Sequence, residues 1–571
     1  MPLGGRQNEK RDYYEDVDPS EIKRILDDIA IRFDGVDNEN VSGALLILLE
    51  IVERLNEENE KLKVENQRLR DENNLLKGEQ SKPKIRGNTN KGKDVSSEKE
   101  RKERKKKKGK KSKAKKHKIK IDRTEICKID RTELPEDAEF KGYENVVVQG
   151  IVIKTDNVEY MKEVFYSPSE KKTYVGKLPD WVKGEYSPDV RSLAYTLKYV
   201  ANMSEPKILE FFENFGIYIS QSTISRILTK DQEEFHKEKD DIFRAGLCST
   251  IYQQIDDTGI RVDGKNLYSQ IVSNPYYTAY FTVPHKDRLT VIDILLCGKE
   301  RTYCFNQEAF FLLEHFRVSK KIIAQLKEAS EDKTISEEEM QILLNRFFPD
   351  PLKGKNNRAR IMEAAAIASY HQQTEIPVVR VLLSDDAPQF KKVTEEQGLC
   401  WVHDGRHYKK LEPIVPLYKE QREDFLTRYW DYYGKLLEYK EHPTCDQAEK
   451  LSDEFDELFS TKTGYYALDD RIEKTKAKKE ELLKVLKYPE LPLHNNDPEL
   501  GARAEKRRQD VSLQTKTEEG TKAKDTFLTI TQTAKKLGVR AYEYIHDRIS
   551  RQFDMPFLAE LIEQRTLPQL E

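Results

Sequence analysis

Three acidic residues stand where they could bind divalent metal ions. Asp256 and Asp385 each follow a run rich in β-forming residues, and Glu499 follows Asn495 and Asn496 at the expected start of a helix. Mg²⁺ and Mn²⁺ prefer oxygen ligands, and two such ions side by side stabilise both the attacking and the leaving oxygen of a phosphodiester displacement. The sequence therefore predicts a two-metal site, with these three carboxylates as metal ligands and catalytic residues, that cuts and joins DNA.

The three acids need a folded core to bring them together, because they lie 129 and 114 residues apart. Three β-rich runs are expected to form a meander, with a short turn at residues 263–266: residues 251–260, 267–272 and 276–283. Helical periodicity dominates two intervals, near residues 305–372 and 411–487. This order predicts an α/β, ribonuclease-H-like core over residues 246–545 with two helical insertions.

Leucines at seven-residue intervals predict a coiled coil near the N-terminus. One seam holds Leu48, Leu55, Leu62, Leu69 and Leu76, and the alternate seam holds Val52, Asn59, Asn66 and Asn73. Asparagine at a seam costs stability but fixes the register and favours a parallel dimer. We expect residues 44–78 to form a leucine zipper that makes a homodimer or higher oligomer; the alternative is a helix that folds back on its own chain.

The composition is typical of a multi-domain protein in water. The 571 residues exceed what one hydrophobic core usually serves. No apolar run approaches the roughly 20 residues of a membrane span, and the first residues lack a secretory signal. We therefore expect a cytoplasmic protein with no membrane partner. Six scattered cysteines without a Cys-x-x-Cys pair predict neither a disulfide framework nor a four-thiolate zinc site.

Positive charge is concentrated in one segment, although the net charge of the chain is only −3. Residues 99–120 hold fifteen Lys or Arg against two Glu, and they include Lys105, Lys106, Lys107 and Lys108. With no apolar periodicity to fold around, residues 79–122 are expected to form a disordered basic arm that binds DNA phosphates. The alternative is a solubilising linker. A small β-rich segment is expected after the arm, at residues 123–185, where short valine and isoleucine runs begin near Val146.

Residues 186–240 have the pattern of a helix-turn-helix. Helical periodicity breaks at residues 214–216, where Gly216 permits a tight turn, and it resumes after Ser220, a suitable N-cap. Four polar side chains of the second helix are then placed to reach bases or phosphates: Gln221, Ser222, Thr223 and Arg226. A plain helical hairpin without DNA contacts fits the same pattern.

Four motifs in a fixed order carry a family resemblance. They are Ile255-Asp256-Asp257-Thr258-Gly259, Ser384-Asp385-Asp386, Cys400-Trp401-Val402-His403-Asp404-Gly405-Arg406, and His494-Asn495-Asn496-Asp497-Pro498-Glu499 followed by Arg503. Together they resemble the insertion-sequence sixty-six family of DDE transposases, from the zipper to residues 542–545. The resemblance implies a bacterial transposase with a retroviral-integrase-like core. It also selects Asp256, Asp385 and Glu499 as the triad over the neighbouring Asp257 and Asp386.

The resemblance also implies cofactors and partners. Two Mg²⁺ or Mn²⁺ ions, the DNA ends of the element, target DNA and accessory proteins encoded by the element are expected, at the bacterial nucleoid. Members of the family commonly carry a cysteine-rich zinc-binding segment between zipper and core, whereas that interval here contains only Cys127. Recognition of the element ends is therefore expected to rest on the basic arm and the helix-turn-helix.

Other residues of the motifs are expected to support the triad. Asn495 and Asn496 would orient Glu499 or bind the backbone, while His403 and Arg406 would lie near the active site or DNA. Trp401 is expected to anchor its motif in the core. The helix after Glu499 carries four cations that either hold phosphates or form a solvated face: Arg503, Lys506, Arg507 and Arg508. Zinc at Cys400, His403 and His407 is disfavoured because no fourth ligand is visible.

Two other functions remain open at this stage. A non-catalytic DNA-binding protein, such as a repressor or a decayed relative, would use only the zipper, arm and helix-turn-helix. A nuclease of the ribonuclease-H fold would cleave DNA without joining it. The N-terminal segment 1–43 and the tail 546–571 predict no function.

Overall fold

The computed structural model describes residues 39–76, 121–129, 140–151, 154–179, 182, 184–330, 333–350, 354–511 and 513–570. The chain divides into two units. The larger unit comprises Met1–Ile85, Lys177–Leu209 and Ser220–Glu571, and the smaller comprises Arg86–Gly176 and Glu210–Ile219. Lys105 to Lys108 and the rest of residues 77–120 lie outside the described residues, so the basic arm stays a prediction. No helix in the described ranges is both long and apolar enough to cross a membrane.

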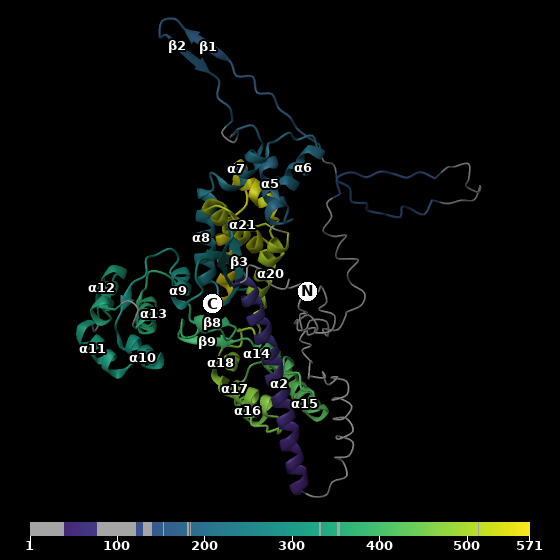
Figure 1. Ribbon diagram of the computed structural model, residues 1–571. Helices are drawn as coiled ribbons and strands as arrows, with labels where there is room; N and C mark the ends of the chain where they lie inside the picture. The colour runs from purple at the N-terminus through teal and green to yellow at the C-terminus, as the bar shows by residue number, and fades with distance from the viewer. Residues whose placement is uncertain are drawn as a thin grey trace, which may run out of the picture. The chain divides into compact units, whose positions relative to one another are not determined.

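A mixed five-stranded sheet is the centre of the larger unit (Figure 1). Its strands follow one another in space as β5 (Thr278–Val283), β4 (Lys265–Ser273), β3 (Tyr252–Val262), β8 (Val381–Ser384) and β9 (Glu396–Leu399). β3, β4 and β5 pair antiparallel, whereas β8 runs parallel to both β3 and β9. The predicted meander is confirmed. Its first turn is tighter than expected, because Asp263 and Gly264 alone reverse the chain with φ angles of 47° and 74°.

One edge of this sheet is covered by a helix that bonds to it with side chains. α21 (Glu518–Lys536) presents Asp525, Thr529 and Thr533 at four-residue spacing, so the three lie on one helical face. They accept hydrogen bonds from alternate backbone N–H groups of β5, those of Thr282, Tyr280 and Thr278, at 2.7, 3.1 and 3.2 Å. The unpaired donors of an edge strand are thereby satisfied without a further strand.

Helices fill the two intervals expected to be insertions. α9 (Arg288–Leu295) follows β5. The first insertion then contains α10 (Gln307–His315), α11 (Lys320–Ser330), α12 (Glu337–Phe347) and α13 (Lys355–Gln372), with a two-stranded sheet of β6 (Tyr303–Cys304) and β7 (Thr334–Ile335). The second contains α15 (Pro416–Tyr439), α16 (Cys445–Leu458), α17 (Tyr466–Lys476), α18 (Lys479–Leu482) and α19 (Lys484–Lys487). Helical character of both intervals is confirmed.

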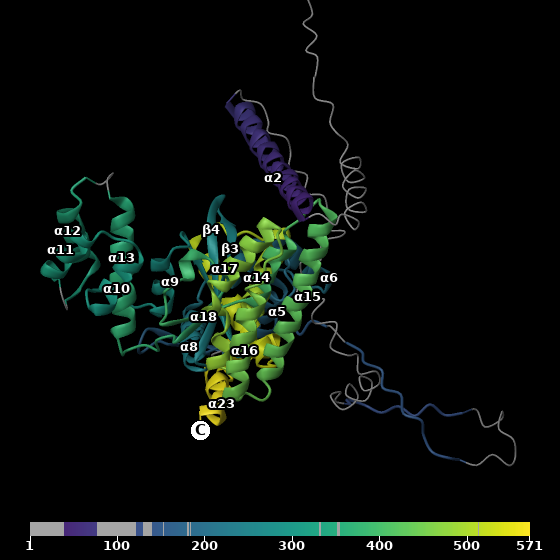
Figure 2. The ribbon, with the colours of Figure 1, turned by 90° about the horizontal axis from the view of Figure 1, so that it is seen from below.

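An aromatic core holds the second insertion against α14 (Trp401–Lys409), the helix that follows β9. Figure 2 shows α14 beside α15 and α17. Trp401 is completely buried there, and its indole N–H donates to the carbonyl of Leu482 at 2.8 Å. Gly405 permits the close approach of α15, since a Cβ atom at this position would lie 2.7 Å from the ring of Trp430. The expected anchoring role of Trp401 is confirmed.

The leucine-repeat segment is one continuous helix, α2 (Glu39–Leu76). Its leucine seam is exposed, with Leu55 and Leu62 each 60% accessible. Another face docks on the same chain through Leu49 and Glu53, whose carboxylate accepts hydrogen bonds from the backbone N–H groups of Ile414 and Val415, just before α15. The helix therefore packs on its own chain through one face, and the exposed leucine seam remains available for the predicted dimer, which stays a prediction.

The helix-turn-helix region has the expected breaks. α5 (Pro188–Tyr199), α6 (Glu205–Asn214), α7 (Gln221–Thr229) and α8 (Glu233–Cys248) follow one another along the chain. Gly216 has a φ angle of 75°, and the Ser220 hydroxyl caps α7 by accepting from the backbone N–H of Thr223 at 3.2 Å. The capping role of Ser220 and the turn at Gly216 are confirmed, and DNA contact by this segment stays a prediction.

The smaller unit contains a β-hairpin later in the chain than its valine runs suggest. β1 (Val164–Ser167) pairs antiparallel with β2 (Lys172–Val175). The run at residues 146–148 is not a strand, so its expected contribution to a sheet is wrong, and residues 152–153 lie outside the described ranges. The hairpin forms where residues 168–171 reverse the chain and bring two strands together, which high β-propensity alone does not achieve.

α20 (Asn496–Asp510) crosses the sheet so closely that only glycine fits at one position. A Cβ atom on Gly501 would lie 2.9 Å from Cγ2 of Ile271 and 3.1 Å from the hydroxyl of Tyr280. We predict that Gly501→Ala lowers the stability of the protein by about 1–3 kcal/mol through overpacking, measured as the urea midpoint of unfolding.

Gly434→Ala in α15 is the matched control, because nothing lies within 4 Å of a Cβ atom there. This substitution should stabilise the helix by up to about 1 kcal/mol. Equal stabilisation by both substitutions would contradict the close contact between α20 and the sheet.

Candidate functional site

The register of two parallel strands sets Asp256 beside Asp385. Gln254 of β3 is paired with Leu383 of β8, and each aspartate stands two residues beyond its member of that pair. Side chains alternate between the two faces of a sheet with a period of two, so the two carboxylates lie at the same level on one face. The strands thus bring together two acids that are far apart in the sequence.

Glu499 enters the same cluster from the first turn of α20. Asn495, fully buried at the N-cap of that helix, fixes its start. The Asn495 side-chain amide donates to the carbonyl of Ile255 at 2.7 Å, and its backbone N–H donates to Sγ of Cys400 at 3.2 Å. Because Ile255 directly precedes Asp256, Asn495 ties the helix carrying the glutamate to the strand carrying the aspartate.

Burial and mutual repulsion disfavour negative charge in this cluster. The pKa of Asp256 is raised to about 7, first by burial and then by the charges of Asp385 and Glu499, against a hydrogen bond from the N–H of Asp257. Burial also raises the pKa of Asp385, against a hydrogen bond from the N–H of Ala387. A bound cation would relieve both effects, so this donor set fits a hard divalent metal ion.

Glu499 is held by cationic and imidazole nitrogens. Nη1 of Arg406 and Nε2 of His403 each lie 3.1 Å from Oε1, while Nη2 of Arg406 lies 3.4 Å from Oε2. Arg503 stands 3.8 Å from Oε2. Within the described residues, no three His, Cys, Asp or Glu side chains are grouped as a set of metal ligands. Joint coordination by the triad therefore requires Glu499 to turn from Arg406 toward the aspartates.

The neighbouring aspartates have partners of their own. Asp257 accepts a hydrogen bond from Gln389 at 2.6 Å and lies 3.6 Å from the ammonium of Lys286. Asp386 pairs with Lys391 at 2.7 Å and with Lys478. The side chains of both residues are thus paired with cations, although their charges also act on the cluster of Asp256 and Asp385. The choice of triad stays a prediction.

A cavity of about 380 Å³ adjoins Asp385 and is bounded largely by α14. Its lining residues are Asp385, Asp386, Ala387, Leu399, Cys400, His403, Asp404, Arg406, His407, Lys410 and Lys478. Burial raises the pKa of the Cys400 thiol to about 12, so it is neutral near pH 7 and serves as the acceptor for Asn495. Lys410 and Lys478 were missed by motif reading, although Lys410 continues the spacing of His403, Arg406 and His407 along one helical face.

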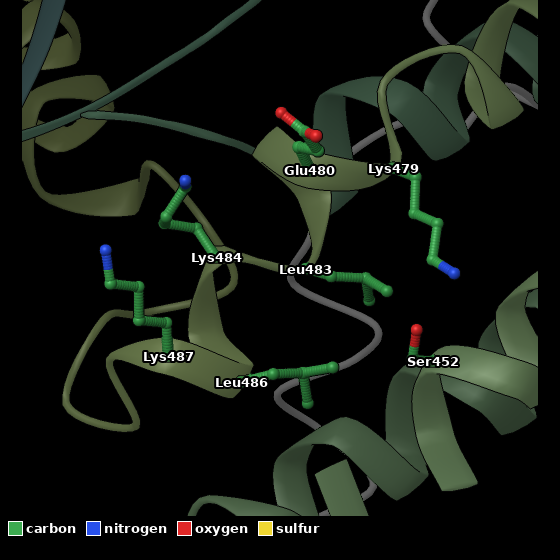
Figure 3. Close-up of a pocket in the computed structure, with 7 residues that line it drawn as sticks. All are labelled: Ser452, Lys479, Glu480, Leu483, Lys484, Leu486 and Lys487. Atoms are coloured by element: carbon green, nitrogen blue, oxygen red, sulfur yellow. The ribbon is translucent and has the colours of Figure 1, made fainter. Parts of the chain in front are cut away.

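A hollow of about 440 Å³ in the second insertion lacks this combination of groups (Figure 3). It is lined by Ser452, Lys479, Glu480, Leu483, Lys484, Leu486 and Lys487. Lys479 pairs with Asp456 at 2.7 Å, and Lys484 and Lys487 both pair with Glu396. Each of these lysines has a carboxylate partner, and Glu480 is the one acid among the lining residues, so the carboxylate cluster is the better candidate site.

The remaining predicted DNA contacts differ in accessibility. On α7, Gln221, Ser222 and Arg226 are exposed and Thr223 is half-buried. On α20, Arg507 is exposed and Arg503 half-buried. Arg508 is only 1% exposed and donates to the carbonyl of Lys198 at 3.1 Å, so its expected phosphate contact is wrong. The fourth cation of this helix, Lys506, is exposed.

The chain is similar in sequence to a bacterial protein. The chain is 31% identical over 314 residues to the uncharacterized protein y4jO of Sinorhizobium fredii. The match covers 94% of y4jO and 54% of this chain. The chain belongs to the y4jO family. No family model matches the chain.

Ionisation of Asp256 provides a test of the buried cluster. Because its pKa is about 7 in the folded chain and ordinarily 3.8, the folded state binds this proton more tightly than the unfolded state. The contribution of Asp256 to stability therefore declines as the pH rises from about 4 to about 7. In EDTA, Asp256→Asn should raise the urea midpoint relative to the native protein more at pH 8 than at pH 5.

Asp263→Asn, at the exposed turn ending β3, is the matched control and should change the midpoint equally at both pH values. An equal effect of Asp256→Asn at both pH values would show that this carboxyl group is not in a repulsive, buried cluster.

Proposed function

We propose that the chain is a DDE transposase similar to the insertion-sequence sixty-six family, which binds element ends and catalyses metal-dependent DNA strand cleavage and strand transfer. The observation that carries the proposal is the register that sets Asp256 beside Asp385, with Glu499 entering the same cluster from α20. The strand order, with three antiparallel strands followed by two parallel ones, supports a ribonuclease-H-like, integrase-like core.

The three carboxylates would hold two Mg²⁺ or Mn²⁺ ions. When bound, these ions would supply activation of the attacking oxygen and charge stabilisation at the leaving oxygen. Asn495 keeps the first turn of α20 against β3, and His403 and Arg406 hold the Glu499 side chain from α14. DNA at the element ends and target, with accessory proteins encoded by the element, would be the partners, and the protein would act at the nucleoid.

Conservative substitutions of the triad test the proposed chemistry. On a supercoiled donor plasmid carrying the element's own ends, with Mg²⁺ or Mn²⁺, Asp256→Asn, Asp385→Asn and Glu499→Gln should each lower cleavage and joining at least about a hundredfold, a loss of roughly 3 kcal/mol of transition-state stabilisation. DNA affinity should be retained.

Asp263→Asn is the matched control, because Asp263 is exposed at the turn that ends β3, and it should retain activity. Cleavage without joining by the native protein would favour a nuclease of the same fold. Binding without cleavage, with accessory proteins supplied, would favour the non-catalytic alternative.

The exposed leucine seam supports self-association. We expect the native chain to be a dimer or higher oligomer, and Leu55→Lys combined with Leu62→Lys to give monomers, because buried lysine is incompatible with a seam position. Sedimentation velocity measures the change.

Val64→Lys is the matched control, since Val64 is 71% exposed on the same helix but lies off both seams. It should leave the oligomer intact. Persistence of the oligomer in the Leu55 and Leu62 variant would move the interface elsewhere.

A further inference from the structure

α14 has two faces with different chemistry. The first face is buried and holds four residues at helical spacing: Trp401, Asp404, Gly405 and Tyr408. The second face lines the cavity beside Asp385. It holds four residues, each two positions after a member of the first face: His403, Arg406, His407 and Lys410. One helix therefore packs against the insertion with its first face and turns nitrogen-bearing side chains toward the carboxylate cluster with its second.

Two of the three acids that line this cavity, Asp404 and Asp386, already have cationic partners. Asp404 pairs with Arg471 and accepts a hydrogen bond from Thr475 at 2.9 Å. Asp386 pairs with Lys391 and Lys478. In the described part of the chain, by contrast, no ion pair or side-chain hydrogen bond joins the exposed ammonium of Lys410 to another residue. The lining thus presents an ammonium group without an ion-pair partner next to a predicted phosphodiester site.

Arg406 would add a second cation once Glu499 is occupied by metal. Its two terminal nitrogens now face the Glu499 carboxylate, while its Nε is buried with no hydrogen-bond partner. A planar guanidinium matches the oxygens of a phosphate as well as those of a carboxylate. If the Glu499 side chain turned toward the aspartates, the terminal nitrogens of Arg406 would be able to bind such a ligand.

We propose that Arg406, His407 and Lys410 of α14 form a binding site for a backbone phosphate of DNA held at the carboxylates. The identification of the ligand as DNA rests on the proposed function. It lies on the helix between β9 and the second insertion, so it gives that insertion a role in holding DNA at the carboxylates. The phosphate contact is independent of base sequence.

Salt dependence of DNA binding tests the site without relying on catalysis. The affinity of the full-length protein for a short oligothymidylate is measured across salt concentrations, with Ca²⁺ present. Loss of one phosphate contact should reduce the slope of log affinity against log salt by about 0.7 for a single strand. Lys410→Gln should show this reduction, with affinity roughly five- to tenfold weaker at low salt.

Lys409→Gln is the matched control, since it removes the same charge from the adjacent residue, which faces Trp430 and not the cavity. It should leave the slope unchanged. Arg406→Gln should reduce the slope with Ca²⁺ but not with EDTA, where Glu499 retains the arginine. An unchanged slope for Lys410→Gln, or an equal reduction for Lys409→Gln, would overturn the proposed site.

Different results would contradict the transposase proposal and the phosphate-site proposal. Cleavage of donor DNA by the native protein with an unchanged slope for Lys410→Gln would leave the transposase proposal standing and remove the phosphate site. A reduced slope for Lys410→Gln in a protein that never cleaves would retain the phosphate site and remove the transposase proposal.

Discussion

The parallel pairing of β3 with β8 is the constraint on which the candidate site depends. It fixes Asp256 and Asp385 at one level of one face, so two acids separated by the whole first insertion share a single environment. Burial of like charges is unfavourable, as the raised pKa of Asp256 reflects. The sheet can hold this arrangement because its own hydrogen bonds and the covering of β5 by α21 stabilise it independently.

Contacts of α20 and α14 then complete the cluster from two directions. Asn495 and Gly501 hold α20 against the sheet, the first through a hydrogen bond and the second through the absence of a side chain. Arg406 on α14 neutralises Glu499 in the absence of metal. Trp401 anchors the same α14 in the aromatic core of the second insertion. α14 therefore connects this insertion to the carboxylates.

The N-terminal helix joins the same insertion through a different kind of contact. Glu53 is buried, and its carboxylate accepts backbone N–H groups at the start of α15, where the helix dipole also favours negative charge. Burial raises the pKa of Glu53, and these hydrogen bonds oppose the rise. α2 thus contacts its own chain with one face, and its leucine seam remains available to a partner.

Periodicity and residue type were enough to predict the local elements: the meander, the helical insertions, the cap at Ser220 and the turn at Gly216. The sequence also predicted the three carboxylates, through their motifs. Features that depend on residues far apart in the sequence could not be predicted in this way. Burial of Arg508, the ion pair of Arg406 with Glu499, and the cavity position of Lys410 and Lys478 arise from contacts across the fold. Local sequence does not encode such contacts, because a charged residue on a helix has the same local preferences whether its side chain meets solvent, a carbonyl or a carboxylate.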